Sequence, residues 1–179
     1  INEVEHCLES ILQNALQLIK APDGFIGLYN DTGDTFIIHH GIGIHASRVM
    51  EQMPNTFGVQ GHVYATGEML YIEDYNSHPR RVQDERLDRL SSIIVLPLKQ
   101  GEHTKGILAA SWVDEVHTIS EEDVKILQQF GDLASVALER SNIHEKSCYL
   151  AFHDELTGLA NRASLNRYLE EEMCNARNG

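Results

Sequence analysis

The feature that most constrains the fold is a pair of apolar segments, residues 92–99 and 105–114, with Gly101 in the turn between them. Successive side chains of a strand point to opposite faces of its sheet. In the first segment both alternating sets are apolar: Ile94, Leu96 and Leu98 form one, and Ile93, Val95 and Pro97 the other. Such a strand is buried on both faces, so the chain must build a sheet with a covering layer on each side.

Helices are expected at both ends of this sheet-forming region. Residues 3–20 carry apolar side chains at spacings of three and four, which predicts an amphipathic helix. A long helix begins at Ser120, with acidic residues in its first turn, and can run about 30 residues, or roughly 45 Å. The segments between predict strands at 25–30, 35–40 and 69–72 and short helices at 46–53 and 58–66.

This order of elements predicts an α+β fold. An antiparallel sheet would carry helices on one face and a partly irregular cover on the other. A pocket between such a cover and the sheet is a usual place for a small ligand.

Charge and composition exclude several functions. The chain has 14 Lys and Arg against 27 Asp and Glu, a net charge of −13, so nucleic acid and anionic lipid are not expected partners. No apolar run approaches the roughly 18 residues that a membrane-spanning helix needs, so this segment is expected to make no membrane contact. The three cysteines, Cys7, Cys148 and Cys174, are odd in number and far apart. They favour reduced thiols and a cytoplasmic location.

Ten histidines raise the question of a metal site. His39 and His40 are adjacent on a predicted strand, so we expect their side chains to face opposite sides. His45, His62 and His78 lie in the middle region without a His-x3-His pair or a carboxylate–histidine motif. We therefore expect no metal site and no catalytic residues.

The segment at residues 58–74 carries a spaced glycine pair, a Thr-Gly dipeptide and a strand that ends in aspartate. These residues are Gly58, Gly61, Thr66, Gly67 and Asp74. Their order resembles the central segment of GAF domains, and the strands at 92–99 and 105–114 resemble a strand pair of that family. The resemblance covers residues 1–142 and implies a GAF sensory domain that receives a ligand or another signal without catalysing a reaction.

A second motif follows the long helix, within residues 151–173. Seven of nine consecutive positions match the Asp-x-Leu-Thr-Gly-Leu-x-Asn-Arg opening of the GGDEF family, the diguanylate cyclases: Asp154, Leu156, Thr157, Gly158, Leu159, Asn161 and Arg162. The resemblance implies a connector helix at 143–153 and the start of a GGDEF domain at 154–179.

That domain would need magnesium and GTP in the parent protein. The Gly-Gly-Asp/Glu-Glu-Phe segment and the metal-binding carboxylates are not in this sequence, so no cofactor is expected for this piece itself. The first residue is Ile1 and the helical pattern is unfinished at Gly179, which favours a piece excised from a longer protein.

The GAF resemblance leaves rival functions to weigh. Relatives that reduce free methionine sulfoxide use cysteines in the central segment, where this chain has Gln60, and in the following loop, and relatives that tether a bilin use a pocket cysteine. Thiolate attack needs a sulfur in the pocket, which counts against both. The Asn-Lys-x-Phe-Asp-Glu set of the cyclic-nucleotide branch is missing as well. A GAF dimerisation scaffold without a small ligand stays open as an alternative.

Five side chains are candidates to line a ligand pocket: Phe57, His62, Tyr64, Tyr71 and Trp112. The aromatic ones have core packing as their alternative role. The apolar stripes of the N-terminal helix and the connector helix predict a homodimer, as is usual for GAF sensors next to cyclase domains, with a monomer as the alternative. The identity of the ligand and the sign of regulation are not readable from the sequence.

Overall fold

The computed structural model describes residues 3–152, with side chains described as far as Ser141. Its centre is a six-stranded antiparallel sheet in the order β3-β2-β1-β6-β5-β4. The strands are β1 (Asp23–Tyr29), β2 (Thr35–Ile42), β3 (Gln52–Pro54), β4 (Leu70–Ile72), β5 (Leu90–Gln100) and β6 (His103–Val113). The chain divides into two compact units, Ile1–Ala137 and Leu138–Gly179, and the sheet belongs to the first.

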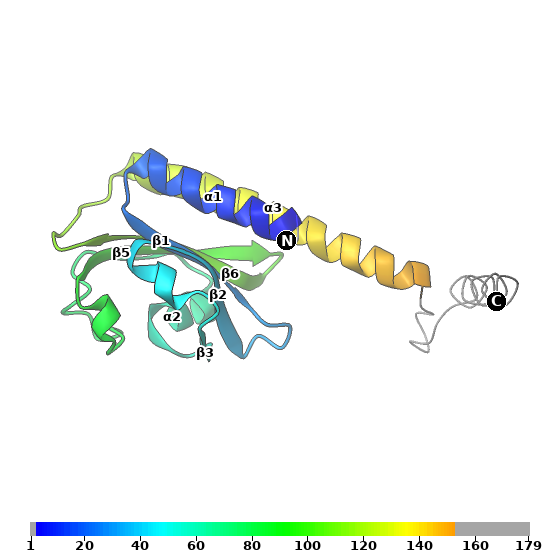
Figure 1. Ribbon diagram of the computed structural model, residues 1–179, viewed down its shortest axis with the longest axis horizontal. Coiled ribbons are helices and arrows are strands. Elements are labelled where there is room, and N and C mark those ends of the chain that lie inside the picture. The colour runs from blue at the N-terminus through cyan, green and yellow to red at the C-terminus, as the bar shows by residue number, and fades with distance from the viewer. Residues whose placement is uncertain (1–2, 153–179) are drawn as a thin grey trace, which may run out of the picture. The chain divides into compact units, whose positions relative to one another are not determined.

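Helices form the two layers that cover the sheet. They are α1 (Glu3–Ile19), α2 (Gly58–Thr66) and α3 (Glu121–Phe152), with short 3-10 helices η1 (Gly43–Arg48) and η2 (Glu85–Leu87). Figure 1 shows α1 and the first part of α3 over one face of the sheet and α2 over the other. The expected α+β fold, with helices on one face and a mixed cover on the other, is confirmed. No helix in the described residues is both long and apolar enough to cross a membrane.

The strand pair β5 and β6 is buried on both faces, as the sequence predicts. Ile93, Val95, Ile107 and Ala109 belong to the core cluster that also contains Val59 and Val63 of α2. The alternate side chains Ile94, Leu96, Leu98, Leu108 and Ala110 are buried as well, and by alternation they face the α1 and α3 layer.

Helix α3 begins with a reciprocal cap. The Ser120 hydroxyl accepts from the Asp123 N–H at 3.1 Å, and the Asp123 carboxylate accepts from the Ser120 N–H at 3.2 Å. Each side chain thus satisfies a backbone donor that the helix leaves free, which fixes the first residue of the helix. The helix then runs 32 residues to Phe152, close to the predicted length.

The prediction of a helix at 46–53 is wrong. The chain instead forms η1 and then β3, where Met53 pairs with Phe36 of β2 and is 6% exposed. Met50, at φ 67°, separates the two elements. Pairing that buries Met53 at the sheet edge outweighs the local helical pattern, and the missing N–H of Pro54 is tolerated on an edge strand.

A β-bulge interrupts β2 at the paired histidines. His40 pairs with Ile26 and Ile38 pairs with Gly27, which leaves His39 without a partner on β1. We expected His39 and His40 to face opposite sides because side chains alternate along a regular strand. The bulge interrupts that alternation at these two residues. The His39 Nδ1 atom lies 3.8 Å from the Glu5 carboxylate of α1.

Two helical glycines give a matched test of this packing. A methyl group on Gly61 would lie 2.5 Å from the backbone carbon of Thr56, whereas one on Gly131 would meet only Leu98 at 3.9 Å. Both substitutions to alanine gain helix propensity, about 0.5–1 kcal/mol. We expect Gly131→Ala to raise the free energy of unfolding in urea by about that amount, and Gly61→Ala to lower it by about 1–3 kcal/mol. Equal effects of the two substitutions would contradict the close approach of α2 to residues 55–56.

Candidate functional site

The motif at residues 58–74 builds and positions α2. Gly58 adopts φ 63° at the first residue of the helix, and Gly67 ends the helix at φ 64°, conformations that favour glycine. The Asp74 carboxylate accepts from the backbone N–H of Asn76 and Ser77 and so forms the turn after β4. Gly58 and Gly67 therefore shape the two ends of α2, and Asp74 shapes the turn after β4.

Large apolar side chains fill the interior between α2 and the sheet. Phe25, Tyr29, Phe36, Met53 and Tyr75 are each at most 7% exposed and belong to one cluster with the apolar residues of α2. The Tyr29 hydroxyl donates to the Gln60 carbonyl at 2.9 Å, which ties α2 to β1. Burial raises the pKa of Tyr29, so the hydroxyl stays protonated and keeps donating.

The five predicted pocket residues fall into separate places. Phe57 precedes α2 and is 44% exposed, and His62 is half-buried on the helix. The Tyr64 ring packs on the Tyr29 ring, with centroids 4.2 Å apart. Tyr71 and Trp112 alternate with residues of the α2 cluster, so they lie on the α1 and α3 face of the sheet.

Tyr71 and Trp112 both contact the segment that leads into α3. The Tyr71 hydroxyl donates to the His117 carbonyl at 2.6 Å, and the His117 ring stacks on the Trp112 indole with centroids 4.1 Å apart. His117 also donates its backbone N–H to the Ser92 hydroxyl at 2.8 Å. These residues anchor the segment before α3, and the five candidates do not converge on one cavity.

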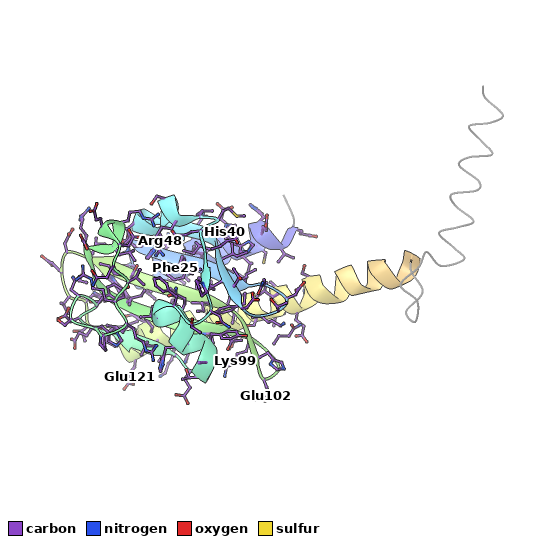
Figure 2. The ribbon with its side chains drawn as sticks, turned by 90° about the horizontal axis from the view of Figure 1, so that it is seen from below. Phe25, His40, Arg48, Lys99, Glu102 and Glu121 are labelled. Atoms are coloured by element: carbon purple, nitrogen blue, oxygen red, sulfur yellow. The ribbon has the colours of Figure 1, made fainter. Side chains whose placement is uncertain are left out.

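A buried polar pair lies under η1. The His45 Nε2 atom is 2.9 Å from the Ser111 hydroxyl, and the imidazole ring lies 4.8 Å from the Phe25 ring (Figure 2 labels Phe25). The Asp23 carboxylate also contacts η1, because the Ile44 N–H donates to it at 2.8 Å. His45 and Ser111 are 1% and 0% exposed, so a substrate cannot reach this serine–histidine pair and its role is structural.

Three of the four arginines in residues 80–89 form ion pairs with acidic residues. Arg81 contacts Asp88 at 2.7 Å, Arg86 contacts Asp84 at 2.6 Å, and Arg89 pairs with Asp114. The hydrogen bond from Arg86 lowers the pKa of Asp84 to about 2. These ion pairs make this part of the surface charge-compensated.

A cavity of about 260 Å³ opens at the end of the sheet. Its wall is formed by the β1–β2 turn, one residue of α2 and the start of β6: Tyr29, Asn30, Asp31, Thr32, Gly33, Tyr64, His103, Thr104 and Lys105. Tyr64 is the predicted pocket residue among them. Nothing in the sequence pattern links Asp31 to Lys105, since only the pairing of β1 with β6 brings the two turns together. Across the described part of the chain, no group of three or more His, Cys, Asp or Glu side chains could hold a metal ion.

The arrangement defines an α+β domain in which short helices cover one face of an antiparallel sheet and terminal helices cover the other. A family model of the GAF domain matches residues 2–139. The chain belongs to the GAF domain family, whose members are typical sensory and regulatory domains of signalling proteins.

Solved structures share this fold at low sequence identity. The GAF domain of the phosphoenolpyruvate-protein phosphotransferase from Coxiella burnetii is 15% identical, with a TM-score of 0.74, over 82% of this chain and 88% of that one. Its counterpart from Acinetobacter is 14% identical, with a TM-score of 0.71, over 80% and 86%. Free methionine-R-sulfoxide reductase from Neisseria meningitidis is 19% identical, with a TM-score of 0.68, over 79% and 81%. No curated protein sequence matches the chain.

Burial of His45 predicts a specific acid sensitivity. Desolvation, helped by nearby Arg48, lowers the pKa of His45 from 6.5 to about 3. Between these values the unfolded chain binds a proton at His45 and the folded chain does not, so stability falls as the pH falls below 6.5. The contribution lost at pH 5 is about 2 kcal/mol.

We therefore expect His45→Gln to flatten the dependence of the unfolding free energy on pH between 7 and 4, measured by urea denaturation. Glutamine keeps a polar atom for Ser111 and removes the titration. The matched control is His6→Gln, since the His6 side chain is 78% exposed. An unchanged pH profile in His45→Gln would show that His45 is not held neutral by the fold.

Proposed function

We propose that this GAF domain is the regulatory part of a signalling protein and controls cyclic-di-GMP synthesis by a GGDEF domain that begins near Asp154. The proposal rests on the Asp-x-Leu-Thr-Gly-Leu-x-Asn-Arg resemblance, which lies outside the described residues, and on α3. That helix starts within the GAF domain at Glu121 and continues to Phe152, just before the motif. In the parent protein the GGDEF domain would use GTP and magnesium.

The first turns of α3 are tied to the sheet, which gives the helix a defined rotational setting. Leu127 and Ala134 are fully buried. The Ser135 hydroxyl accepts the backbone N–H of Lys99, at the end of β5, at 3.0 Å. A change in the sheet that rotates or shifts this half of α3 is transmitted along a continuous helix, because its backbone hydrogen bonds resist independent rotation of successive turns.

The proposal includes a homodimer. Leu18 of α1 and Leu133 and Val136 of α3 are 59%, 56% and 47% exposed, although they are large apolar side chains. Cys7 is exposed and lies eleven residues before Leu18, which places the two on one side of α1. A second copy that covers these side chains would bring two GGDEF domains together, as a product made from two GTP molecules requires.

Inserting alanines between Arg140 and Ser141 tests whether output depends on the rotation of α3 about its axis. The experiment uses the protein that carries both this domain and its GGDEF domain. Two added alanines rotate everything beyond them by about 200°, whereas seven rotate it by only about 20° from the original direction. We expect the two-residue insertion to lower cyclic-di-GMP formation from GTP and magnesium about tenfold. The seven-residue insertion is the matched control and should retain most activity.

Equal activities of the two insertion variants would contradict transmission through the helix. No cyclic dinucleotide from the unaltered protein would contradict the proposed output itself.

The dimer predicts a cross-link through Cys7. If α1 packs beside α1 of a second copy, mild oxidation should join two chains, and Cys7→Ser should abolish this species on a non-reducing gel. Cys148→Ser serves as the control that retains the α1 thiol. We expect Leu133→Glu to remove both the cross-link and the dimer measured by sedimentation, because it places a charge in the apolar contact. A monomer in sedimentation experiments with the unaltered chain would overturn this part of the proposal.

One observation favours the ligand-free scaffold as a second candidate. The interior between α2 and the sheet, where a ligand was expected, is occupied by Phe25, Tyr29, Phe36 and Tyr75. A thermal-shift screen of metabolites separates the two candidates, since a scaffold gains no stability from any small molecule whereas a sensor is stabilised by the one it binds.

A further inference from the structure

The cavity at the end of the sheet has fixed walls. The β1–β2 turn is closed by Gly33, whose N–H donates to the Asn30 carbonyl at 2.9 Å. The Asn30 amide oxygen accepts from the N–H groups of Asp34 and Thr35, and the Asn55 amide donates to the Gly33 carbonyl at 2.6 Å. A ligand that enters this cavity therefore meets a turn that is already ordered, which lowers the entropic cost of binding.

Two oppositely charged side chains line this cavity. Asp31 is on the β1–β2 turn and Lys105 is on β6, and both line the cavity. Within the described residues neither side chain takes part in an ion pair, although arginines elsewhere in the domain are paired. Unpaired groups of opposite charge across one cavity suit a ligand that carries both an ammonium and a carboxylate group.

Part of the wall is aromatic, beside polar residues such as Asn30, Thr32 and Thr104. The Tyr64 ring lines the cavity and packs on Tyr29, whose hydroxyl is held by the Gln60 carbonyl. A fixed aromatic ring offers a surface for a small apolar group. The volume of about 260 Å³ lies below the range of about 300–1,000 Å³ typical of sites for drug-sized ligands, so the ligand is smaller than these.

We propose that this cavity binds a free α-amino acid with a small apolar side chain, and that binding alters the contact between the β5–β6 hairpin and α3. The carboxylate would pair with Lys105, the ammonium with Asp31, and the side chain would rest on Tyr64. The site is separate from the filled interior under α2. The regulatory consequence rests on the proposed function, whereas binding itself does not.

A β-bulge joins the cavity to α3. Leu98 pairs with Gly106 and Lys99 with Thr104, which leaves Lys105 without a partner on β5. At this irregular point the Lys99 N–H donates to the Ser135 hydroxyl of α3 at 3.0 Å, and that hydroxyl donates to the Gly131 carbonyl at 2.9 Å. Figure 2 labels Lys99 and, at the tip of the same hairpin, Glu102. A ligand whose carboxylate pairs with Lys105 therefore binds at the residue where the register between β5 and β6 shifts, next to the contact with α3.

The test is an NMR titration of the ¹⁵N-labelled 179-residue chain. Its three ligands share the carbon skeleton of leucine and differ in their charged groups. L-Leucine carries both charges, N-acetyl-L-leucine carries only the carboxylate, and L-leucinamide carries only the ammonium group. We expect L-leucine at millimolar concentration to shift the amide signals of Gly33, Thr104 and Lys105, and the other two probes to bind about tenfold more weakly. Equal binding of all three, or no shift at these residues, would overturn the site.

Two variants, each lacking one charge of the cavity, test which side chain binds each charged group of the ligand. Lys105→Gln and Asp31→Asn should each weaken L-leucine binding about tenfold, because each removes one charge-assisted contact. Lys125→Gln, which removes an exposed lysine of α3, is the matched control and should bind L-leucine as the unaltered chain does. Unchanged binding in Lys105→Gln or Asp31→Asn would overturn the assignment.

Ser135→Ala tests the coupling separately. We expect this variant still to bind L-leucine, with an affinity changed by no more than the coupling between the two sites, and to lose the ligand-induced shifts of the amides at Gly131 and Ala134. If these shifts persist, the proposed route through Lys99 and Ser135 is overturned. Since none of these measurements uses GTP, failure of the cyclase proposal and failure of this one are distinguishable.

Discussion

The burial of β5 and β6 on both faces is the constraint on which the rest of the domain depends. Ile93 and Val95 face the α2 cluster, while Ile94 and Leu96 face the layer of α1 and α3, and all four are at most 3% exposed. Neither layer can be removed without exposing one side of these strands to water. The two layers are thereby linked through the central strands, because a displacement of either one changes the packing of side chains attached to the same backbone.

Close packing also determines where the domain can respond to a ligand. Rings such as Phe36 and Tyr75 are buried in the interior under α2, at 0% and 1% exposed, and close-packed interiors of this kind leave few voids. At the end of the sheet, by contrast, polar residues of two turns line an open space, and a bulge at Lys105 already interrupts the ladder. Rearrangement at a bulge breaks fewer ladder hydrogen bonds than rearrangement within a regular strand pair.

Sequence patterns predicted the elements whose signals are local. The limits of α1 and α2, the β5–β6 pair and the cap and length of α3 follow from periodicity, glycine positions and the Ser120–Asp123 spacing. Strand β3 was missed, because only its pairing with β2 makes Met53 part of the core. The bulge at His39 was missed for the same reason, since it is a property of the register between two strands.

The candidate site was less accessible to prediction for a physical reason. Aromatic residues such as Tyr71 and Trp112 attract attention in a sequence, but alternation along a strand decides which face they occupy, and one residue of register reverses it. The cavity instead combines Tyr64 with Asp31 and Lys105, two charged residues of ordinary appearance that become neighbours only because β1 pairs with β6. Their unpaired state is visible only once the ion pairs around them are known.

In the proposed signalling route, the Lys99–Ser135 contact is the point at which the end of the sheet acts on α3. Toward its start the helix is held by the Ser120–Asp123 cap and by buried Leu127, which resist movement. Ser135 lies near the last residue of the first compact unit, Ala137, so it is among the final points at which the sheet can impose a rotation on the helix. Beyond Ser135 the described side chains of α3 are at most partly buried: Ala137, Leu138 and Ser141 are half-buried, and Val136, Glu139 and Arg140 are exposed. For that reason a hydrogen bond at the end of β5 can bias the direction of α3 more effectively than packing changes nearer the helix start.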